Sequence, residues 1–388
     1  MVINVVIGFF VAMSSGCAVV IAQIYGAKNH EKLSRATGTA VAMCLLIGAV
    51  LSAVGYFLTP AMLRLLKTPE DTLAGSICYL QIIFLGTIPN LLYNIESGIL
   101  RAVGDSRSPF LYLCICCAVN IILDLTFVIY FDMGVSGVAI ATVLSQVISA
   151  VLATVKLMRT KESHRLMLSR IRLDKVLLRH MMELGIPSGL QSVMYTFSSM
   201  IIQVAINTLG TVVVAGWTLA GKVDGFYWAC SGAAGVAVMN FTAQNYGAGK
   251  EDRIRECRRK AMLLFTAFTV FSSLLILSLS KTVLPLFTDD QAVIDQTFQI
   301  MMYFVPVYFT WTYVEIISGA LRGVGDAVKP TIICGLGICL FRLLWTIVVF
   351  PLIPNIFIVS VCYPISWVIT DIAFFCYCRK SKWKSMMA

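Results

Sequence analysis

The sequence Ser97-Gly98-Ile99-Leu100-Arg101-Ala102-Val103-Gly104-Asp105 recurs as Ser318-Gly319-Ala320-Leu321-Arg322-Gly323-Val324-Gly325-Asp326, 221 residues further along the chain. When both copies are extended to Pro109 and Pro330, eight of the thirteen positions are identical. A second motif, Ala22-Gln23-Ile24-Tyr25-Gly26-Ala27-Lys28, returns from Ala243 with the same offset. Two motifs that share one offset indicate an internal duplication.

The composition places the duplicated chain in a membrane. Of its 388 residues, 59% are hydrophobic and only 13% are charged, and the mean hydropathy is +0.85. Soluble domains carry roughly 25% charged residues, so this chain has about half the charge of a soluble protein. The same numbers exclude a disordered chain, a collagen-like repeat and a secreted disulfide scaffold.

Apolar runs of about 20 residues predict the membrane-crossing helices. There are eleven such runs: 2–25, 38–59, 76–100, 109–130, 134–157, 186–210, 223–246, 260–281, 295–319, 330–351 and 355–378. They predict an all-α polytopic membrane protein. Because one 221-residue period contains six helices, both copies cross the membrane in the same direction and form two parallel-related lobes.

The repeat also predicts the domain boundaries. We expect an N-lobe over 1–157, a basic cytoplasmic linker over 158–185 and a C-lobe over 186–388. The opening helix of the second copy, 186–210, has no counterpart in the first copy. The complete architecture is therefore predicted to be six plus six helices, of which eleven are present, and the chain is expected to be a truncated gene product or a natural fragment.

The basic residues predict the orientation. When alternate loops are assigned to the same side of the membrane, 25 of the 30 Lys and Arg residues fall on one side and four on the other, with Arg342 left inside a helix. The positive-inside rule makes the first side cytoplasmic. We expect a multi-pass protein of the plasma (inner) membrane with a cytoplasmic C-terminus.

The segment 158–183 is rich in Lys and Arg with Leu and Met between them. It is typical of an amphipathic connection that lies on anionic membrane lipid. The alternative is nucleic-acid binding, which such a short patch flanked by membrane helices does not favour. We therefore expect membrane lipids, and no nucleic acid, as partners.

The repeated motifs fall where predicted helices end. Arg101 and Arg322 complement the negative end of a helix, and the glycines that follow supply a sharp turn. Gly26 and Gly247 are expected to be C-caps. Structural punctuation is one interpretation of the L-R-x-V-G-D motif, and gating on the cytoplasmic side is the alternative.

The thirteen cysteines include one C-x-x-C pair, Cys114 and Cys117. No second pair at zinc spacing and no flanking His accompany it. The cysteines therefore favour packing on membrane helices over a metal site.

Ionisable residues inside predicted helices are costly and usually functional. Glu96 and Asp371 lie near the ends of their helices, which predicts ordinary solvated carboxylates. Asp124 lies mid-helix, and Asn120 one turn before it shares its face. This pair suits binding of Na⁺ or a proton, or alternatively a structural hydrogen bond between helices.

The helices 295–319 and 330–351 contribute Glu315 and Arg342, for which a buried ion pair is the default interpretation and a C-lobe ionisable site the alternative. The repeat does not extend to these ionisable residues. In the first copy, Asn94 stands at the position equivalent to Glu315, and Ile121 at the position equivalent to Arg342. In the second copy, Trp345 stands at the position equivalent to Asp124. The two halves are therefore expected to have different functional roles.

The helix 295–319 is also rich in aromatic residues. Tyr308 and Trp311, with Gln191 on the helix 186–210, are candidates to line a substrate cavity, since aromatic rings beside a carboxylate attract organic cations. The alternative is that the rings only pack or lie at the membrane interface.

Together, the A-Q-x-Y-G-A ends, the paired S-G-x-L-R-x-V-G-D motifs, the Asn120–Asp124 helix and Gly137-Val-Ala-Ile-Ala-Thr142 resemble the MATE family of multidrug and toxic compound extrusion transporters. The resemblance implies twelve helices in two lobes and outward efflux of organic, often cationic, compounds in exchange for Na⁺ or H⁺. It assigns cation coupling to Asn120, Asp124 and Thr142.

This chain departs from the family pattern at two points. The partner Asp on the family's first helix is absent, and so is the acidic residue that some relatives carry on the seventh helix. Glu315 is the candidate C-lobe substitute.

Secondary active antiport without a cofactor, by a monomer, is the function that these expectations favour. A flippase for lipid-linked oligosaccharides and a non-functional fragment are the alternatives. A membrane enzyme is not expected, because the three His (His30, His164 and His180) lie in predicted cytoplasmic loops and form no catalytic or metal-binding set.

Overall fold

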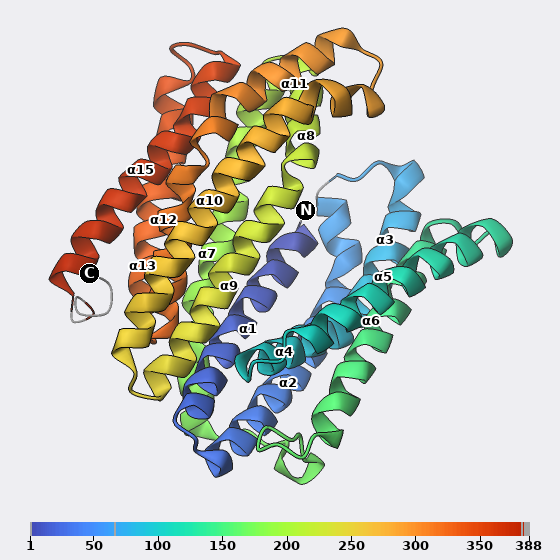
Figure 1. The fold of residues 1–388 in the computed structure, drawn as a ribbon. Helices are drawn as coiled ribbons and strands as arrows, with labels where there is room; N and C mark the ends of the chain where they lie inside the picture. The colour runs from blue at the N-terminus through green and yellow to red at the C-terminus, as the bar shows by residue number, and fades with distance from the viewer. Residues whose placement is uncertain (1, 66, 382, 384–388) are drawn as a thin grey trace. The chain divides into compact units, whose positions relative to one another are not determined.

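The computed structural model describes residues 2–65, 67–381 and 383, and over these residues it contains helices and no strand, which confirms the predicted all-α class. The chain divides into two compact units, here called the N-terminal unit (Val6–Ile186) and the C-terminal unit (Pro187–Ala388 with Met1–Val5). Figure 1 shows them from blue to green and from green to red. The boundary falls inside one helix, α7, at Pro187.

In the part of the chain that the structure describes, the N-terminal unit contains six long helices, two shorter segments and the first part of a further helix. They are α1 (Val2–Gly26), α2 (His30–Leu65), α3 (Glu70–Leu85), α4 (Thr87–Ala102), α5 (Arg107–Leu125) with the π-helical extension η1 (Thr126–Tyr130), α6 (Gly134–Arg159), η2 (Leu168–Arg170) and the first part of α7 (Lys175–Asn207). Within this unit α4 packs against α2 and α6, and α5 packs against α6.

The C-terminal unit contains the rest of α7 and the following elements: α8 (Thr211–Val223), α9 (Gly225–Gly247), α10 (Glu251–Val283), η3 (Leu284–Leu286), α11 (Gln291–Phe304), η4 (Val305–Val307), α12 (Phe309–Gly323), α13 (Val328–Cys334), η5 (Gly335–Leu340), α14 (Phe341–Leu344), η6 (Trp345–Val349) and α15 (Ile356–Lys380). Its core is built around α12, which packs against α9, α10 and α15.

Each predicted run coincides with a helix or with consecutive helices. Among the described residues, eight helices are long and apolar enough to cross a membrane, and ten are if each of two bent pairs is one span. The remaining predicted span, 223–246, is the less apolar helix α9. The short apolar helix α8 was not predicted.

The two bends fall at equivalent places in the repeat. One of 41° separates α3 from α4 at Gly86, and one of 54° separates α11 and η4 from α12. Gly86 plus 221 is Val307, the last residue of η4. The duplication therefore extends from the motifs to the course of the backbone.

The ends of α1 and α9 differ in detail from the prediction. Both helices end at the expected glycine, Gly26 and Gly247, but the left-handed residue lies two positions later. Lys28 has φ 55° and its equivalent Gly249 has φ 68°. The prediction of a C-cap at Gly247 is therefore wrong, because Gly247 is the last helical residue of α9 and Ala248 is its C-cap, although both helices end at the predicted glycines.

The L-R-x-V-G-D turns have the same geometry in both units. Gly104 and Gly325 have φ 96° and 94°, a conformation that glycine adopts at little cost. The following acids bind the next helix: the Ser108 amide donates to Asp105 at 3.0 Å, and the Lys329 amide donates to Asp326 at 3.4 Å. The motif thus ends one helix and begins another.

The same two acids also hold the last helix of each unit. Lys156 of α6 lies 3.8 Å from Asp105, and the Tyr377 hydroxyl of α15 donates to Asp326. Lys156 and Tyr377 are themselves 221 residues apart. Although burial alone would raise the pKa of Asp105, hydrogen bonds from Ser108 and the charge of Lys156 hold it below its ordinary value. These contacts support the structural interpretation of the motif, in which it ends one helix and begins the next.

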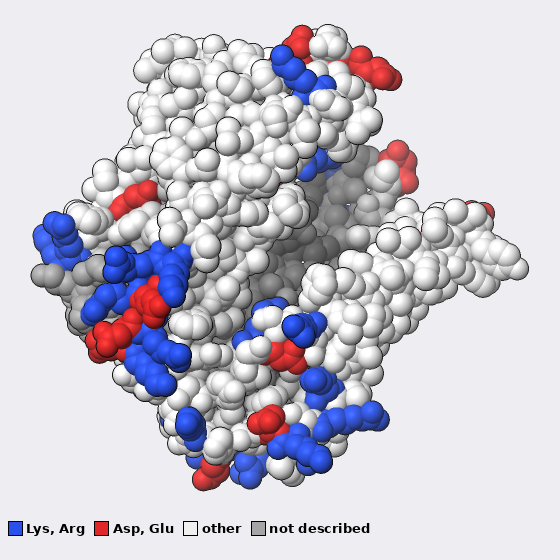
Figure 2. Space-filling view, viewed as in Figure 1, with Lys and Arg blue, Asp and Glu red and all other residues white. Residues whose placement is uncertain are grey.

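Basic side chains gather at particular loops of each unit (Figure 2). In the N-terminal unit they lie near the α1–α2 turn and the α6–α7 connection, and in the C-terminal unit near the α9–α10 turn and the end of α15. Broad uncharged flanks cover the helices between them. This distribution is that of a multi-pass membrane protein.

The connection from α6 to α7 is seated on α2. Apart from the turn η2, residues 160–174 are not helical, and α7 begins at Lys175, before the predicted 186. Thr39 donates to the Arg172 carbonyl at 3.2 Å, and the Asp174 amide donates to Thr39 at 3.3 Å. A Cβ on Gly38 would lie 2.0 Å from the Arg170 carbonyl oxygen, so the chain can lie this close only against glycine.

Close packing of α9 on α12 leads to a first prediction. A Cβ on Gly319 would lie 2.7 Å from the Gly235 carbonyl oxygen, so the two backbones leave no room for a methyl group. Gly319→Ala is expected to destabilise the protein by about 1–3 kcal/mol, the usual cost of overpacking. The measurement is the thermal unfolding midpoint of purified protein in detergent.

Gly232→Ala is the matched control, because a Cβ at Gly232 on α9 would meet nothing within 4 Å. It is expected to be neutral or slightly stabilising, since alanine favours a helix. Equal losses for the two variants would contradict the close contact.

The α6–α7 connection leads to a prediction on pH. His164 is 7% exposed, and burial lowers its pKa from the ordinary value. In the unfolded segment the imidazole takes up a proton at about pH 6.5, which the folded segment resists. Stability from the neutral His164 is therefore present above this pH and is lost as the pH falls below it.

We expect hydrogen-exchange protection of residues 160–174, corrected for the intrinsic effect of pH, to fall between pH 7.5 and 5.5 in the wild type. His164→Gln stays neutral over this range and should lose less protection. The same loss in both proteins would show that another group is responsible.

Candidate functional site

The predicted coupling residues lie on the packed pair α5 and α6 of the N-terminal unit. Asn120 and Asp124 are half-buried on α5, and Thr142 is half-buried on α6, where its hydroxyl donates to the Val138 carbonyl at 2.9 Å. The Nδ2 atom of Asn120 and the Oδ1 atom of Asp124 are buried without a hydrogen-bond partner among the described residues. Buried polar atoms normally have partners, so the carboxylate oxygen is available to a cation or a donor, whereas the amide nitrogen can only donate.

Glu96 was predicted to be a solvated carboxylate, and the structure shows that this is wrong. Its side chain on α4 is 0% exposed because α6 covers it. The Thr154 hydroxyl donates to Oε1 at 2.7 Å, and Oε2 has no partner among the residues described. The position near the end of an apolar run did not reveal this burial. Asp371, treated in the same way, is half-buried on α15.

A second group of residues surrounds a cavity of about 240 Å³ in the C-terminal unit. Two neighbouring helices, α8 and α9, and the bent pair α11–α12 supply most of its wall, and α15 completes it. The lining residues are Trp217, Gly221, Asp224, Trp228, Phe304, Tyr308, Tyr363 and Trp367. We call this space the aromatic cavity.

Asp224 is the only carboxylate that lines the aromatic cavity. It is 5% exposed and lies at the junction of α8 and α9. The Tyr308 hydroxyl donates to its Oδ2 atom at 2.5 Å, and the Trp228 indole donates to the same atom at 3.0 Å. The described residues provide no salt bridge to it. Sequence reasoning missed Asp224, although this residue falls at the start of the predicted helix 223–246. The apolar run Thr211–Ala215 with Trp217, which indicates the helix α8 just before it, was overlooked as well.

The predicted ion pair between Glu315 and Arg342 is absent from the described residues. Arg342 is 7% exposed, donates to Ser366 at 3.1 Å, and places its guanidinium carbon 3.9 Å from the centre of the Tyr363 ring. Glu315 instead lies against α9, where a Cβ on Gly235 would be 1.9 Å from its Oε1 atom. The default interpretation of a buried pair is therefore wrong, and the two side chains contact different partners.

The three predicted cavity residues have different positions. Tyr308 is fully buried and lines the aromatic cavity. Trp311 packs against Trp228 and Trp367 and donates to Ser231 at 2.9 Å, but it does not line the cavity.

Gln191 is 4% exposed and belongs to a polar network. Arg322 of the repeated motif donates to its Oε1 atom at 2.8 Å, and Gln191 donates to the Tyr195 hydroxyl at 2.9 Å. On the same helix as Gln191, the carbonyl of Pro187 accepts a hydrogen bond from the Thr331 hydroxyl at 3.1 Å. These bonds join α7, α12 and α13.

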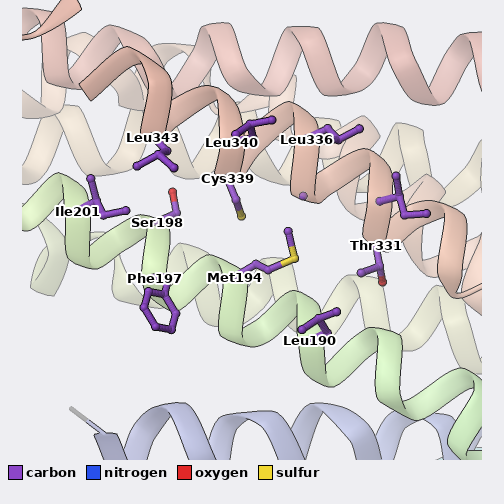
Figure 3. Close-up of a pocket in the computed structure, with 12 residues that line it drawn as sticks. Leu190, Met194, Phe197, Ser198, Ile201, Thr331, Leu336, Cys339, Leu340 and Leu343 are labelled. Atoms are coloured by element: carbon purple, nitrogen blue, oxygen red, sulfur yellow. The ribbon is translucent and has the colours of Figure 1, made fainter. Parts of the chain in front are cut away.

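An apolar cavity of about 510 Å³ lies between α7 and the stretch α13–α14 (Figure 3). Met194 and Ser198 on α7 and Cys339 on η5 point into the space between the two helical stretches. None of its lining residues is charged, in contrast with the aromatic cavity. It offers hydrophobic contact and no group that would select a cation.

No group of three or more His, Cys, Asp or Glu side chains that could hold a metal ion occurs among the described residues. The thirteen cysteines form no disulfide.

A duplicated, all-helical, multi-pass protein with buried ionisable groups in both units has the architecture of a secondary transporter. The family model described as MatE matches residues 1–126 and 187–348, and the chain belongs to this family. The resemblance predicted from the motifs is thus confirmed. Membership makes the chain a MATE transporter rather than an enzyme.

Two Bacillus subtilis (strain 168) proteins are among the relatives in sequence. "Probable multidrug resistance protein YoeA" is 29% identical over 336 residues, or 84% of this chain and 72% of the relative. "Probable multidrug resistance protein YpnP" is 30% identical over 253 residues, or 65% of this chain and 56% of the relative. The chain thus spans about half to three quarters of these relatives' length.

Solved structures with the same fold include "Crystal structure of MATE in the straight conformation", with a TM-score of 0.90 at 19% identity, covering 97% of this chain and 85% of that one. A "Vibrio cholerae MATE transporter VcmN in the bent form" has a TM-score of 0.87 at 20% identity, with coverage of 97% and 85%. At these identities the likeness establishes the fold.

The burial of Glu96 gives a testable prediction. A lone buried carboxylate with no cation beside it is costly, and its amide isostere keeps the shape and still accepts from Thr154. Glu96→Gln is therefore expected to keep the wild-type unfolding midpoint, whereas Glu96→Lys, which buries a cation without a partner, should lower stability by several kcal/mol, about the effective cost of one buried ion.

Glu31→Lys is the control for a change of charge at the surface, because the Glu31 side chain is 76% exposed. It should leave the midpoint nearly unchanged. A loss in Glu96→Gln as large as that in Glu96→Lys would contradict this account of the site.

Proposed function

We propose that this chain exports organic, mainly cationic drugs or toxic metabolites across the plasma membrane in exchange for Na⁺ or H⁺. The names of its relatives support export of drugs: the two Bacillus proteins are probable multidrug resistance proteins, and a Staphylococcus aureus (strain MRSA252) relative, 20% identical over 359 residues, is "Multidrug export protein MepA". No cofactor is required beyond the coupling ion.

The coupling ion binds at Asn120, Asp124 and Thr142 in this proposal. The observation that carries it is the buried Oδ1 atom of Asp124, which has no hydrogen-bond partner among the described residues and lies one helical turn from Asn120 on α5. A carboxylate, an amide and a hydroxyl supply oxygen atoms, which are the ligands that hard cations prefer. The same carboxylate accepts a proton if the ion is H⁺.

Coupling follows from differential affinity. The ion at Asp124 stabilises one arrangement of the two units, the organic cation stabilises the other, and exchange of the two ligands alternates access to the two sides of the membrane. Each ligand shifts the equilibrium only by the difference in its affinity for the two arrangements. The substrate is bound in the C-terminal unit, where Tyr308 and its neighbours form an aromatic wall.

The orientation and environment complete the proposal. The basic loops and the C-terminus lie in the cytoplasm, where the α6–α7 connection contacts anionic lipid, and the protein acts as a monomer. The 25-to-4 distribution of basic residues supports this orientation.

Asp124→Asn tests the coupling site. The substitution keeps the shape of the side chain but removes its charge, and interactions of this kind contribute about 1.5–3 kcal/mol, so efflux should fall by about tenfold to more than a hundredfold. The measurement is efflux of a fluorescent organic cation from proteoliposomes with an imposed Na⁺ gradient and, separately, an imposed proton gradient.

Asp132→Asn is the matched control. Asp132 is exposed and has φ 52°, a conformation that asparagine also tolerates, so this variant should transport like the wild type. Unimpaired efflux by Asp124→Asn would refute Asp124 as the coupling residue, and absence of cation efflux from wild-type proteoliposomes under both gradients would refute the antiport.

A further inference from the structure

A cavity of about 230 Å³ lies in the N-terminal unit, where the α6–α7 connection rests on α2. Two lining residues belong to α2, and the others belong to the connection, far later in the chain. The lining residues are Arg35, Thr39, Arg170, Arg172, Leu173 and Asp174. We call this space the arginine pocket. Three of these side chains are positively charged and one is negatively charged, so the pocket has an excess of positive charge.

The backbone around the arginine pocket is held by contacts that do not use the arginine side chains. The Thr39 hydroxyl donates to the Arg172 carbonyl and accepts from the Asp174 amide. The Arg172 amide in turn donates to the Arg170 carbonyl at 2.9 Å, and this carbonyl lies against Gly38. The pocket is therefore formed without a ligand, and little ordering of the backbone is needed on binding.

The one negative group of the pocket is already used by the protein. Asp174 accepts hydrogen bonds from the amides of Val176 and Leu177 at 3.0 and 3.2 Å, and so caps the start of α7. Its Oδ2 atom lies 3.8 Å from the guanidinium of Arg35, which also lies 3.8 Å from the exposed Glu31. Contacts of this kind between partly exposed groups are weak. Asp174 therefore leaves the positive charge of the pocket largely available.

Arg170 and Arg172 carry charges that the protein does not pair. Within the part of the chain that the structure describes, neither guanidinium forms a hydrogen bond or a salt bridge. Arg170 is half-buried and Arg172 is exposed, so both are accessible to a ligand. A guanidinium presents several N–H donors in a planar fork that matches the oxygen atoms of a phosphate group. Two such groups at one small pocket therefore favour an anion of this kind.

The surroundings of the pocket indicate where the phosphate comes from. The connection joins the apolar helices α6 and α7, which are both long enough to cross a membrane. Leu173 lines the pocket and is exposed, and Leu168 and Val176, close to it in sequence, are exposed as well. Exposed apolar side chains among basic ones are typical of a segment at the surface of an anionic membrane. A lipid headgroup is thus the expected carrier of the phosphate.

From these observations we propose that the arginine pocket binds the phosphate group of an anionic membrane lipid. Arg170 and Arg172 donate to the phosphate oxygens, and Arg35 adds positive charge from α2. Free phosphate has the same chemistry, and the experiment separates the two sources. The site deepens the proposed contact of the α6–α7 connection with anionic lipid and rests on that contact for the source of its ligand.

The experiment measures binding of dioleoylphosphatidylglycerol to the purified protein in a neutral detergent, by native mass spectrometry at constant ionic strength. Dioleoylglycerol is the reference ligand, because it has the same acyl chains and no phosphate. Phosphatidylglycerol should bind at least about tenfold more tightly, since hydrogen bonds between charged groups are the strong ones. Equal binding of the two lipids would overturn the proposal.

Two double variants test the donors. Arg170→Gln combined with Arg172→Gln removes both charges and should weaken phosphatidylglycerol binding by at least about tenfold. Arg170→Lys combined with Arg172→Lys keeps the charges, loses the planar forks and should weaken binding severalfold. The thermal unfolding midpoint checks that each variant is folded, and if the glutamine variant is not, the lysine variant carries the test. An unchanged affinity in a folded variant would contradict the site.

Arg253→Gln combined with Arg259→Gln is the matched control. Both residues are exposed on α10, in another basic region, and the variant loses the same two charges. It should bind phosphatidylglycerol like the wild type. A loss as large as that of the pocket variant would show a diffuse attraction to basic surfaces and would overturn the proposal.

Inorganic phosphate distinguishes the two sources of the ligand. At a concentration equal to that of the lipid, it should leave bound phosphatidylglycerol in place. Displacement by phosphate, but not by chloride at the same ionic strength, would overturn the lipid as the source. Efflux by a wild-type protein that does not prefer phosphatidylglycerol would refute the site and leave the antiport standing. Binding at the pocket without efflux under either gradient would do the reverse.

Discussion

Both halves of this protein depend on one turn, in which a left-handed glycine is followed by an aspartate. Gly104 and Gly325 reverse the chain, and Asp105 and Asp326 each bind the start of the next helix and the last helix of their unit. A helix end leaves its last carbonyl groups and the first amide groups of the following helix without partners inside the helices, and here the aspartate side chains accept from those amides. The L-R-x-V-G-D motif provides both the reversal and the partners, which explains why it occurs once in each copy.

The duplication and the apolar runs made most of the scaffold predictable, because both can be identified from short stretches of the sequence. Membrane helices follow from length and hydropathy alone. The buried carboxylates were not predictable in the same way. Glu96 is covered by Thr154, which is 58 residues away, and Asp224 is bound by Tyr308, which is 84 residues away. Such contacts depend on tertiary packing, and no periodic pattern near either residue predicts them.

The same limit explains the absent ion pair. Glu315 and Arg342 have opposite charges on predicted neighbouring helices, and in sequence this favours a pair. In the structure Arg342 stacks on Tyr363 and donates to Ser366, while Glu315 of α12 lies against Gly235 of α9, where the two helices pack closely. The face on which a side chain lies is decided by packing. The sequence shows only the helix on which it lies.

The two units share a backbone course but not their ionisable chemistry, and this difference suits two kinds of cation. Asp124 has an amide one turn away and a hydroxyl on the packed neighbouring helix, and in the proposed coupling site the oxygen atoms of these groups would bind a proton or a small hard ion. Asp224 has aromatic rings around it instead, and two of these, Tyr308 and Trp228, donate hydrogen bonds to it. In the proposed exchange the coupling ion binds in the N-terminal unit and the organic cation in the C-terminal unit. The two ions would then not compete for one carboxylate, and each would act on the other through the arrangement of the two units.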